Sequence, residues 1–132
     1  MSTKKRVLVV DDSATIRRHL RAILEDEGVE VLDATNGAEG LVEALRQPVD
    51  LFILDVNMPG TNGLEMLTQL RELEGYASTP AFVLTAESSP ALVEQGRKVG
   101  ATAWIIKPVN PATLVRGVRQ VLARASAQKA VP

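Results

Sequence analysis

Residues 51–67, LFILDVNMPGTNGLEML, contain the pattern that decides the fold. The run from Leu51 to Leu54 is apolar enough to form a buried strand, and Asp55 follows it directly. Gly60 and Gly63 then bracket a turn, after which leucines recur at helical spacing. Because an unpaired charge beside a buried strand is costly, Asp55 is expected to belong to a site that supplies it with partners.

The same alternation of strand and helix continues along the whole chain. Further apolar strands are expected at residues 7–10, 29–34, 81–84 and 101–106, each followed by a segment with apolar residues at helical spacing. Such strands, separated by helices, predict an α/β domain with a doubly wound parallel sheet and right-handed crossovers.

Two helix faces are predicted from the positions of charged and apolar residues. Arg17, Arg18 and Arg21 form a basic cluster on the first helix, which is expected to be a solvated face. The second helix is expected to begin at Asn36 and to end before Pro48. Its inner face is predicted to consist of the apolar residues Ala38, Leu41, Val42 and Leu45.

Length and composition indicate one compact domain. The chain has 132 residues, 45% of them hydrophobic, so residues 1–132 are expected to form a single domain with its core at about 6–124 and a frayed tail at 125–132. With 15 Lys and Arg against 16 Asp and Glu, no global positive field favours nucleic acid or an anionic membrane as a partner. No segment suits a signal peptide or a membrane span, so a soluble cytoplasmic protein is expected.

Polar residues follow four of the predicted strands directly. They are Asp11, Asp12, Asp55, Thr85 and Lys107. In doubly wound sheets, ligands bind outside the carboxyl ends of the strands. These residues are therefore expected to form one site.

Three carboxylates in one site repel each other and require a proton, a cation or a metal. With no cysteine in the chain and His19 as its one histidine, the ligands are oxygens, and Mg²⁺ is the leading candidate. A metal beside a lysine and a threonine hydroxyl suits a phosphoryl group, with one aspartate as the nucleophile. The alternative is that Asp11 or Asp12 only caps the first helix, that Asp55 caps a turn, and that Lys107 balances their charge. Convergence at the ends of several strands favours function.

Four segments in order carry a resemblance to a known family. They are VLVVDDSATIRR (7–18), LFILDVNMPGTNGLEML (51–67), FVLTAE (82–87) and GATAWIIKPVNPATL (100–114). The chain resembles the receiver domains of two-component response regulators from Val7 to about Leu122, most closely the stand-alone chemotaxis regulators. This resemblance implies a flavodoxin-like sheet of order 2-1-3-4-5 flanked by five helices, an order for which such a regulator is itself a standard example.

The resemblance also implies roles for the acidic residues. Asp55 would accept the phosphoryl group. Asp11, Asp12, Asp55 and the backbone carbonyl of Asn57 would hold Mg²⁺. Asn57 and Glu87 would influence how water reaches the phosphorylated side chain, and the phosphoryl group is expected to be lost relatively quickly.

The remaining implied roles concern switching. Lys107 would bind a phosphoryl oxygen, and the hydroxyl of Thr85 would move to bind another. Trp104 occupies the position of the aromatic switch residue. The Lys107–Pro108 peptide bond is often cis in relatives.

As a function, the resemblance implies a stand-alone response regulator that is not an enzyme but carries out self-phosphorylation and self-dephosphorylation. Its partners would be a sensor histidine kinase and a downstream protein bound at the face of the fourth helix, fifth strand and fifth helix. Chemotaxis, with a flagellar switch protein as target, is the leading role. The alternatives are a carrier in a phosphorelay, a haloacid-dehalogenase-like phosphohydrolase, whose Asp-x-Asp pattern fails at Ser13, and a phosphorylation-independent interaction module.

Overall fold

Five parallel strands form one sheet in the order β2-β1-β3-β4-β5, which confirms the predicted flavodoxin-like fold. The computed structural model describes residues 4–58, 60, 62–87 and 89–130. The strands are β1 (Arg6–Val10), β2 (Glu30–Ala34), β3 (Leu51–Asp55), β4 (Ala81–Thr85) and β5 (Ala103–Ile106). The helices within these residues are α1 (Ala14–Glu25), α2 (Gly37–Arg46), α3 (Gly63–Glu72), α4 (Pro90–Lys98) and α5 (Pro111–Ala130).

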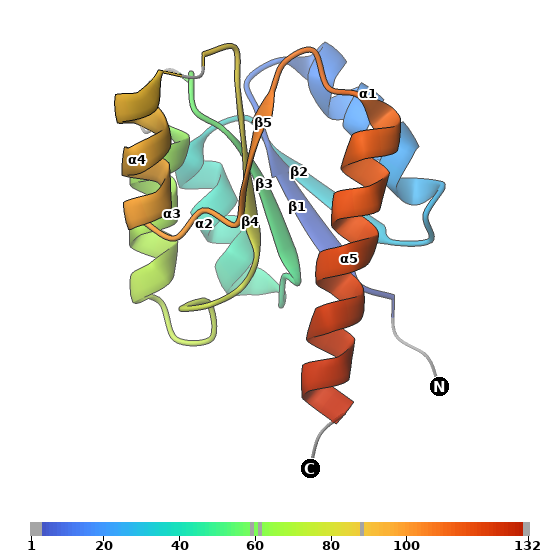
Figure 1. Cartoon of the computed structure of the whole chain (residues 1–132). Coiled ribbons are helices and arrows are strands. Elements are labelled where there is room, and N and C mark those ends of the chain that lie inside the picture. Colours follow the sequence, from blue (N-terminus) through green and yellow to red (C-terminus); the bar gives the residue numbers. More distant parts are fainter. Residues whose placement is uncertain (1–3, 59, 61, 88, 131–132) are drawn as a thin grey trace.

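The helices cover both faces of the sheet, so each central strand is buried on two sides (Figure 1). Leu8, Phe52 and Leu54 face the core beneath α2, α3 and α4. Val7 and Ile53 face the second core, beneath α1 and α5. Because successive side chains of a strand point to opposite faces, an unbroken apolar run is what such a strand requires.

Each helix begins with a polar side chain that caps it. Ser13, Asn36, Asn62 and Ser89 each accept a hydrogen bond from the backbone N–H three residues ahead, and Asn110 does so at the start of α5. These caps satisfy donors that a helix leaves free at its first turn. The strand ends themselves lie close together because the parallel strands pair side by side in the sheet.

The predicted inner face of α2 is wrong. Ala38 is exposed, and Val42 and Leu45 are 54% and 69% exposed, although Leu41 does pack against the core. The buried residues of this helix are the small ones, Gly37, Gly40 and Ala44. A Cβ on Gly40 would meet the side chains of Met66 and Val10, so only a small residue allows the close approach of α2.

Gly63, the first residue of α3, lies against the backbone of Asp55. A Cβ built on Gly63 would overlap the Asp55 carbonyl oxygen and lie 2.9 Å from its carbonyl carbon. Gly63→Ala is therefore expected to lower the free energy of unfolding in urea by about 1–3 kcal/mol, because neither backbone can yield cheaply. Gly40→Ala is the control, since it presses mainly on the flexible end of Met66 and gains helix propensity, and it should cost clearly less. Equal costs would contradict this explanation.

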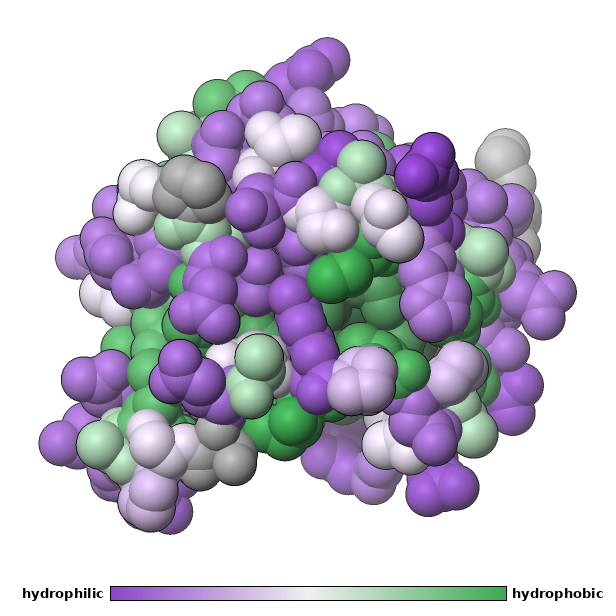
Figure 2. All heavy atoms as spheres, turned by 90° about the horizontal axis from the view of Figure 1, so that it is seen from above, coloured by the Kyte–Doolittle hydropathy of each residue, from purple (hydrophilic) through white to green (hydrophobic). Residues whose placement is uncertain are grey.

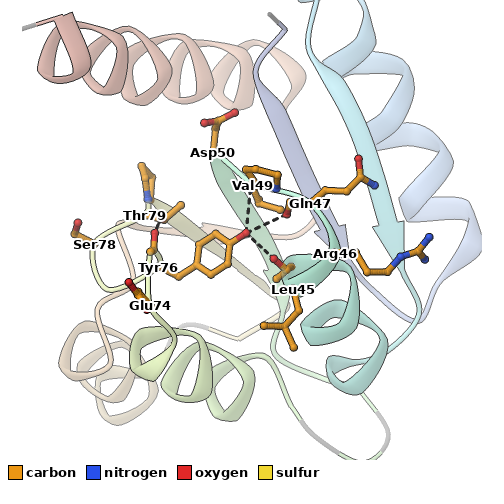
Figure 3. A pocket seen from close by; sticks show the side chains of 13 residues that line it. Leu45, Arg46, Gln47, Val49, Asp50, Glu74, Tyr76, Ser78 and Thr79 are labelled. Carbon is orange, nitrogen blue, oxygen red and sulfur yellow. Dashed lines mark hydrogen bonds between the residues drawn. The ribbon is translucent and has the colours of Figure 1, made fainter.

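A hollow of about 630 Å³ lies at the opposite, amino-terminal edge of the sheet (Figure 3). Tyr76 lines it and is itself buried. Its hydroxyl accepts a hydrogen bond from the Val49 N–H at 3.1 Å and donates to the Ala44 carbonyl at 2.7 Å. Its ring meets Phe52 edge to face, with centroids 5.2 Å apart. Tyr76 thus joins the α3–β4 connection to the end of α2 and the start of β3.

The final helix continues to Ala130. Fraying of residues 125–132 stays a prediction, since a helical backbone does not report how readily it opens, and residues 131–132 lie outside the described residues. No helix in the described part of the chain is both long and apolar enough to cross a bilayer.

Candidate functional site

The sheet brings the predicted polar residues to one edge. Asp11 follows β1, Asp55 ends β3, Thr85 ends β4 and Lys107 follows β5, and these four strands are successive neighbours in the sheet. Asp11, Asp55 and Thr85 are the buried polar residues of the described chain, whereas Asp12 is exposed. Seen from above, this edge is largely hydrophilic, with hydrophobic atoms visible between the polar side chains (Figure 2).

Asp11, Asp12 and Asp55 form a carboxylate cluster in which one oxygen from each residue lies within 4.8 Å of the others. Two of these residues also serve local turns. Asp11 Oδ1 accepts a hydrogen bond from the Ser13 N–H at 2.9 Å, and Asp55 Oδ1 accepts one from the Asn57 N–H at 3.2 Å. The alternative of local caps holds for Asp55, which accepts a hydrogen bond within its own turn, but α1 is capped by Ser13 and not by Asp11 or Asp12. Local caps also do not explain why the three carboxylates converge.

Lys107 places its ammonium group between two of the carboxylates. Its Nζ lies 3.1 Å from Asp55 Oδ1 and 3.3 Å from Asp11 Oδ2. Burial disfavours the charged amine, but Asp55 and Asp11 outweigh that effect, so the pKa of Lys107 is raised. The Lys107–Pro108 peptide bond is cis, as the resemblance implies.

Asp55 is held in an environment that disfavours its charge. Burial, followed by the negative charge of Asp11, raises the pKa of Asp55, although Lys107 and the Asn57 N–H act in the opposite direction. Both hydrogen bonds to this carboxylate, from Lys107 and from Asn57, are made to Oδ1. Oδ2 takes part in neither of them.

The carboxylate cluster has capacity for a further cation. Asp11 Oδ2 is buried and, apart from its ion pair with the Lys107 ammonium at 3.3 Å, has no hydrogen-bond partner among the described residues. A buried charged oxygen is costly unless it is paired, and here a single ammonium is shared between two buried carboxylates. The donors are all oxygens, which suits a hard divalent cation.

Thr85 and Trp104 are linked through Glu87. The Thr85 hydroxyl accepts a hydrogen bond from the Glu87 N–H at 3.0 Å, and the Glu87 carbonyl accepts one from Trp104 Nε1 at 3.3 Å. The indole of Trp104 lies over Gly96 of α4, where a Cβ would come within 2.5 Å of its Cζ3. The partly exposed indole is therefore connected to the edge of the acidic site by two hydrogen bonds.

Comparison with known proteins decides the family. The family model described as the response regulator receiver domain matches residues 7–119. The chain belongs to this family. It is therefore a signalling phosphoacceptor rather than a conventional enzyme, which argues against the phosphohydrolase alternative. Membership of the receiver-domain family implies that a cognate histidine kinase is a partner of this chain.

Similar proteins include a longer protein and one of nearly the same length as this chain. The transcriptional regulatory protein ResD of Bacillus subtilis is 41% identical over 125 residues, which cover 95% of this chain and 51% of ResD. PilH of Pseudomonas aeruginosa is 35% identical over 118 residues, covering 89% of this chain and 98% of PilH. The chain thus spans about half the length of ResD and nearly all of PilH.

Solved structures agree with this placement. The chemotaxis protein CheY4 of Vibrio cholerae is 41% identical, covers 90% of this receiver domain and 99% of its own chain, and has a TM-score of 0.87. A CheY-like receiver domain of Methanospirillum hungatei is 30% identical with a TM-score of 0.89, covering 96% of this chain and 99% of its own.

The predicted solvated face of α1 is wrong for two of its three arginines. Arg18 is exposed, but Arg17 and Arg21 both lie near Asp33 of β2, with nitrogen to oxygen distances of 3.6 and 3.5 Å. Arg17 also donates to the backbone carbonyl of Asp11. Charge spacing along one helix does not reveal a partner on another strand, so the sequence pattern alone did not indicate these contacts. His19, also on α1, is exposed.

Proposed function

We propose that this receiver domain accepts a phosphoryl group on Asp55 from the phosphohistidine of its kinase, in a Mg²⁺-dependent reaction. The observation that carries the proposal is the arrangement of the carboxylate cluster, in which Asp55 is 1% exposed and lies 3.1 Å from the Lys107 ammonium. CheY4 of Vibrio cholerae is a chemotaxis protein. Its similarity supports a role for this chain as a stand-alone cytoplasmic regulator in chemotaxis.

In the proposed transfer, an Asp55 carboxylate oxygen attacks phosphorus while the bond from phosphorus to the histidine nitrogen breaks, and the imidazole keeps the electron pair. Asp11, Asp12, Asp55 and the Asn57 carbonyl would hold Mg²⁺, which would neutralise charge on the phosphoryl oxygens. Lys107 binds one of these oxygens and offsets the negative charge that the transfer brings to a buried aspartate.

Thr85 and Trp104 are proposed to transmit the effect of phosphorylation from the acidic site to the surface of the domain. The Thr85 hydroxyl would leave the Glu87 N–H to bind the phosphoryl group, which would disturb the segment that holds the indole. The α4, β5 and α5 face would then change its affinity for a downstream protein, a flagellar switch protein in a chemotaxis role. Ile106, which is 43% exposed, adds apolar surface to that face. Asn57 and Glu87 are both exposed beside the site, where they would control the approach of water during self-dephosphorylation.

The single tryptophan of the chain provides a direct test. Addition of Mg²⁺, and then of acetyl phosphate or beryllofluoride, is expected to change the fluorescence of Trp104, because its indole N–H is bonded to the segment that carries Thr85. Mass spectrometry after rapid acid quench should show one added phosphoryl group. No fluorescence response together with no mass gain would rule out the proposed function.

A second experiment distinguishes motor control from phosphate relay. Pull-down with beryllofluoride-loaded protein should capture a switch-type target that the untreated protein does not retain. Transfer of phosphate from Asp55 to a histidine of another protein, with no such capture, would instead favour the phosphorelay role.

A further inference from the structure

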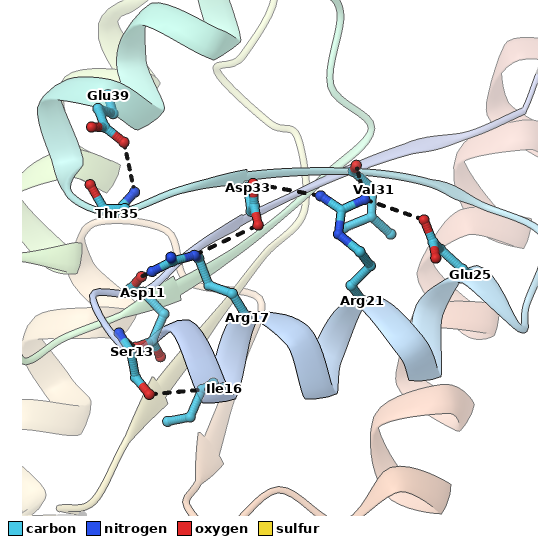
Figure 4. A network of polar contacts seen from close by, with 10 residues as sticks. All are labelled: Asp11, Ser13, Ile16, Arg17, Arg21, Glu25, Val31, Asp33, Thr35 and Glu39. Carbon is cyan, nitrogen blue, oxygen red and sulfur yellow. Dashed lines mark hydrogen bonds and ion pairs between the residues drawn. The ribbon is translucent and has the colours of Figure 1, made fainter.

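Arg17 connects the carboxylate cluster to the edge strand β2. Its Nη1 donates a hydrogen bond to the backbone carbonyl of Asp11 at 2.7 Å, and its Nε lies 3.6 Å from Asp33 Oδ2. The Arg17 side chain is 16% exposed, unusually low for an arginine on a surface helix. Figure 4 shows it reaching from the first turns of α1 back towards the connection after β1 and across to β2.

The carbonyl that Arg17 binds belongs to the peptide unit between Asp11 and Asp12. A peptide unit is planar, so fixing its oxygen fixes the orientation of the backbone on both sides. The Asp11 N–H is held by the Ala34 carbonyl at 3.1 Å, and the Asp11 side chain is held by the Ser13 N–H. Arg17 therefore supplies the contact that orients the link between the two consecutive carboxylates.

The positive charge of Arg17 alone would disfavour a cation nearby. Asp33 compensates this charge, and Arg21 shares the same carboxylate at 3.5 Å. We therefore expect the orienting effect of Arg17 on the Asp11–Asp12 turn to outweigh the repulsion between its guanidinium and a bound cation. We propose that Arg17 is a positioning residue that holds the Asp11–Asp12 turn in its cation-binding conformation and so sets the affinity for Mg²⁺. This inference rests on the Mg²⁺ site of the proposed function.

The test compares Mg²⁺ affinity in Arg17→Met and Arg21→Met by titration calorimetry. Arg17→Met should bind Mg²⁺ about tenfold more weakly, as is typical when a group that orients a metal ligand is removed. Arg21→Met is the matched control, because Arg21 also contacts Asp33, Glu25 and the Val31 carbonyl but not Asp11. Its affinity should stay within about twofold of the wild type, since the turn is untouched. The Mg²⁺-induced shift of the urea midpoint gives the same comparison if a variant is destabilised.

Asp33→Asn provides a second variant whose folding is not in question, since the Asp33 side chain is 40% exposed. Asp33→Asn should also weaken Mg²⁺ binding, because it leaves the positive charge of Arg17 uncompensated near the cation. High salt should reduce this loss of affinity, because it screens the repulsion between Arg17 and Mg²⁺. The effect of Arg17→Met should persist in high salt. Equal Mg²⁺ affinity in Arg17→Met and the wild type, or equal losses in both arginine variants, would overturn the inference alone. A wild type that does not bind Mg²⁺ would overturn the proposed function as well.

Discussion

Replacement of Asp55 by asparagine is expected to abolish phosphoryl acceptance. The amide has nearly the same shape as the carboxylate but lacks its nucleophilic oxygen. Wild-type protein treated with acetyl phosphate and Mg²⁺ should gain one phosphoryl group on the peptide that contains Asp55, and Asp55→Asn should gain none. Asp26→Asn, which changes an exposed acid near the end of α1, should be phosphorylated like the wild type. Persistent labelling of Asp55→Asn at the wild-type level would show that another residue is the acceptor.

The same substitution should stabilise the metal-free protein at neutral pH. Burial and Asp11 raise the pKa of Asp55 in the folded state. A carboxyl group with a raised folded pKa contributes stability below its unfolded pKa, and this contribution is lost as pH rises through the folded value. Above that value the ionised Asp55 therefore destabilises the fold. Asp55→Asn should raise the free energy of unfolding in EDTA by about 1 kcal/mol at pH 7, and the gain should disappear at acidic pH. A gain that is the same at both pH values would contradict this origin.

The position of the site was largely predictable, because the spacing of apolar residues and the ends of the strands are local features of the sequence. Asp11, Asp55, Thr85 and Lys107 each stand at the end of a strand-like run, and parallel strands place such ends at one edge. Their convergence follows from topology. The side-chain orientations do not follow, since the link from Trp104 to the Glu87 carbonyl depends on how β5 packs against α4.

Prediction failed where a small residue or a distant partner decides the packing. Two large apolar residues of α2, Val42 and Leu45, suggest the wrong inner face, because this helix approaches the sheet through its small residues Gly37, Gly40 and Ala44. Arg17 lies on a face that looks solvated until β2 brings Asp33 beside it. Both errors concern tertiary contacts that overrule local periodicity.

Lys107→Met is expected to produce the largest loss of stability at the site. The substitution removes the ammonium that lies within 3.3 Å of both Asp11 and Asp55, and leaves two carboxylates almost completely buried. Breaking such a pair by removing one partner typically costs 3–5 kcal/mol. Because the Lys107 side chain is 21% exposed, water screens part of the charge, and a loss of about 3 kcal/mol is expected in EDTA at pH 7.

The pH dependence identifies the cause of that loss. The pKa of Lys107 is raised, so its stabilising contribution is complete below its unfolded pKa and is lost only as pH rises through the folded value. The wild type has this contribution at pH 7, whereas the variant lacks it at every pH. Without the lysine the pKa of Asp55 should rise further, so acid should restore the variant by protonating that carboxyl group.

Two further changes, one of solvent and one of sequence, should also restore the stability of Lys107→Met. Mg²⁺ supplies a replacement cation, and Asp55→Asn in the Lys107→Met background removes one of the two buried charges. The double-mutant cycle, measured by urea unfolding in EDTA, should therefore give a coupling energy of about 1–3 kcal/mol between the two positions. A loss in Lys107→Met that neither acid, Mg²⁺ nor the second substitution reverses would mean that Lys107 stabilises the fold through the packing of its methylene groups. In that case its charge would be free to act on the phosphoryl group alone, and the stability of the metal-free site would need another source of positive charge.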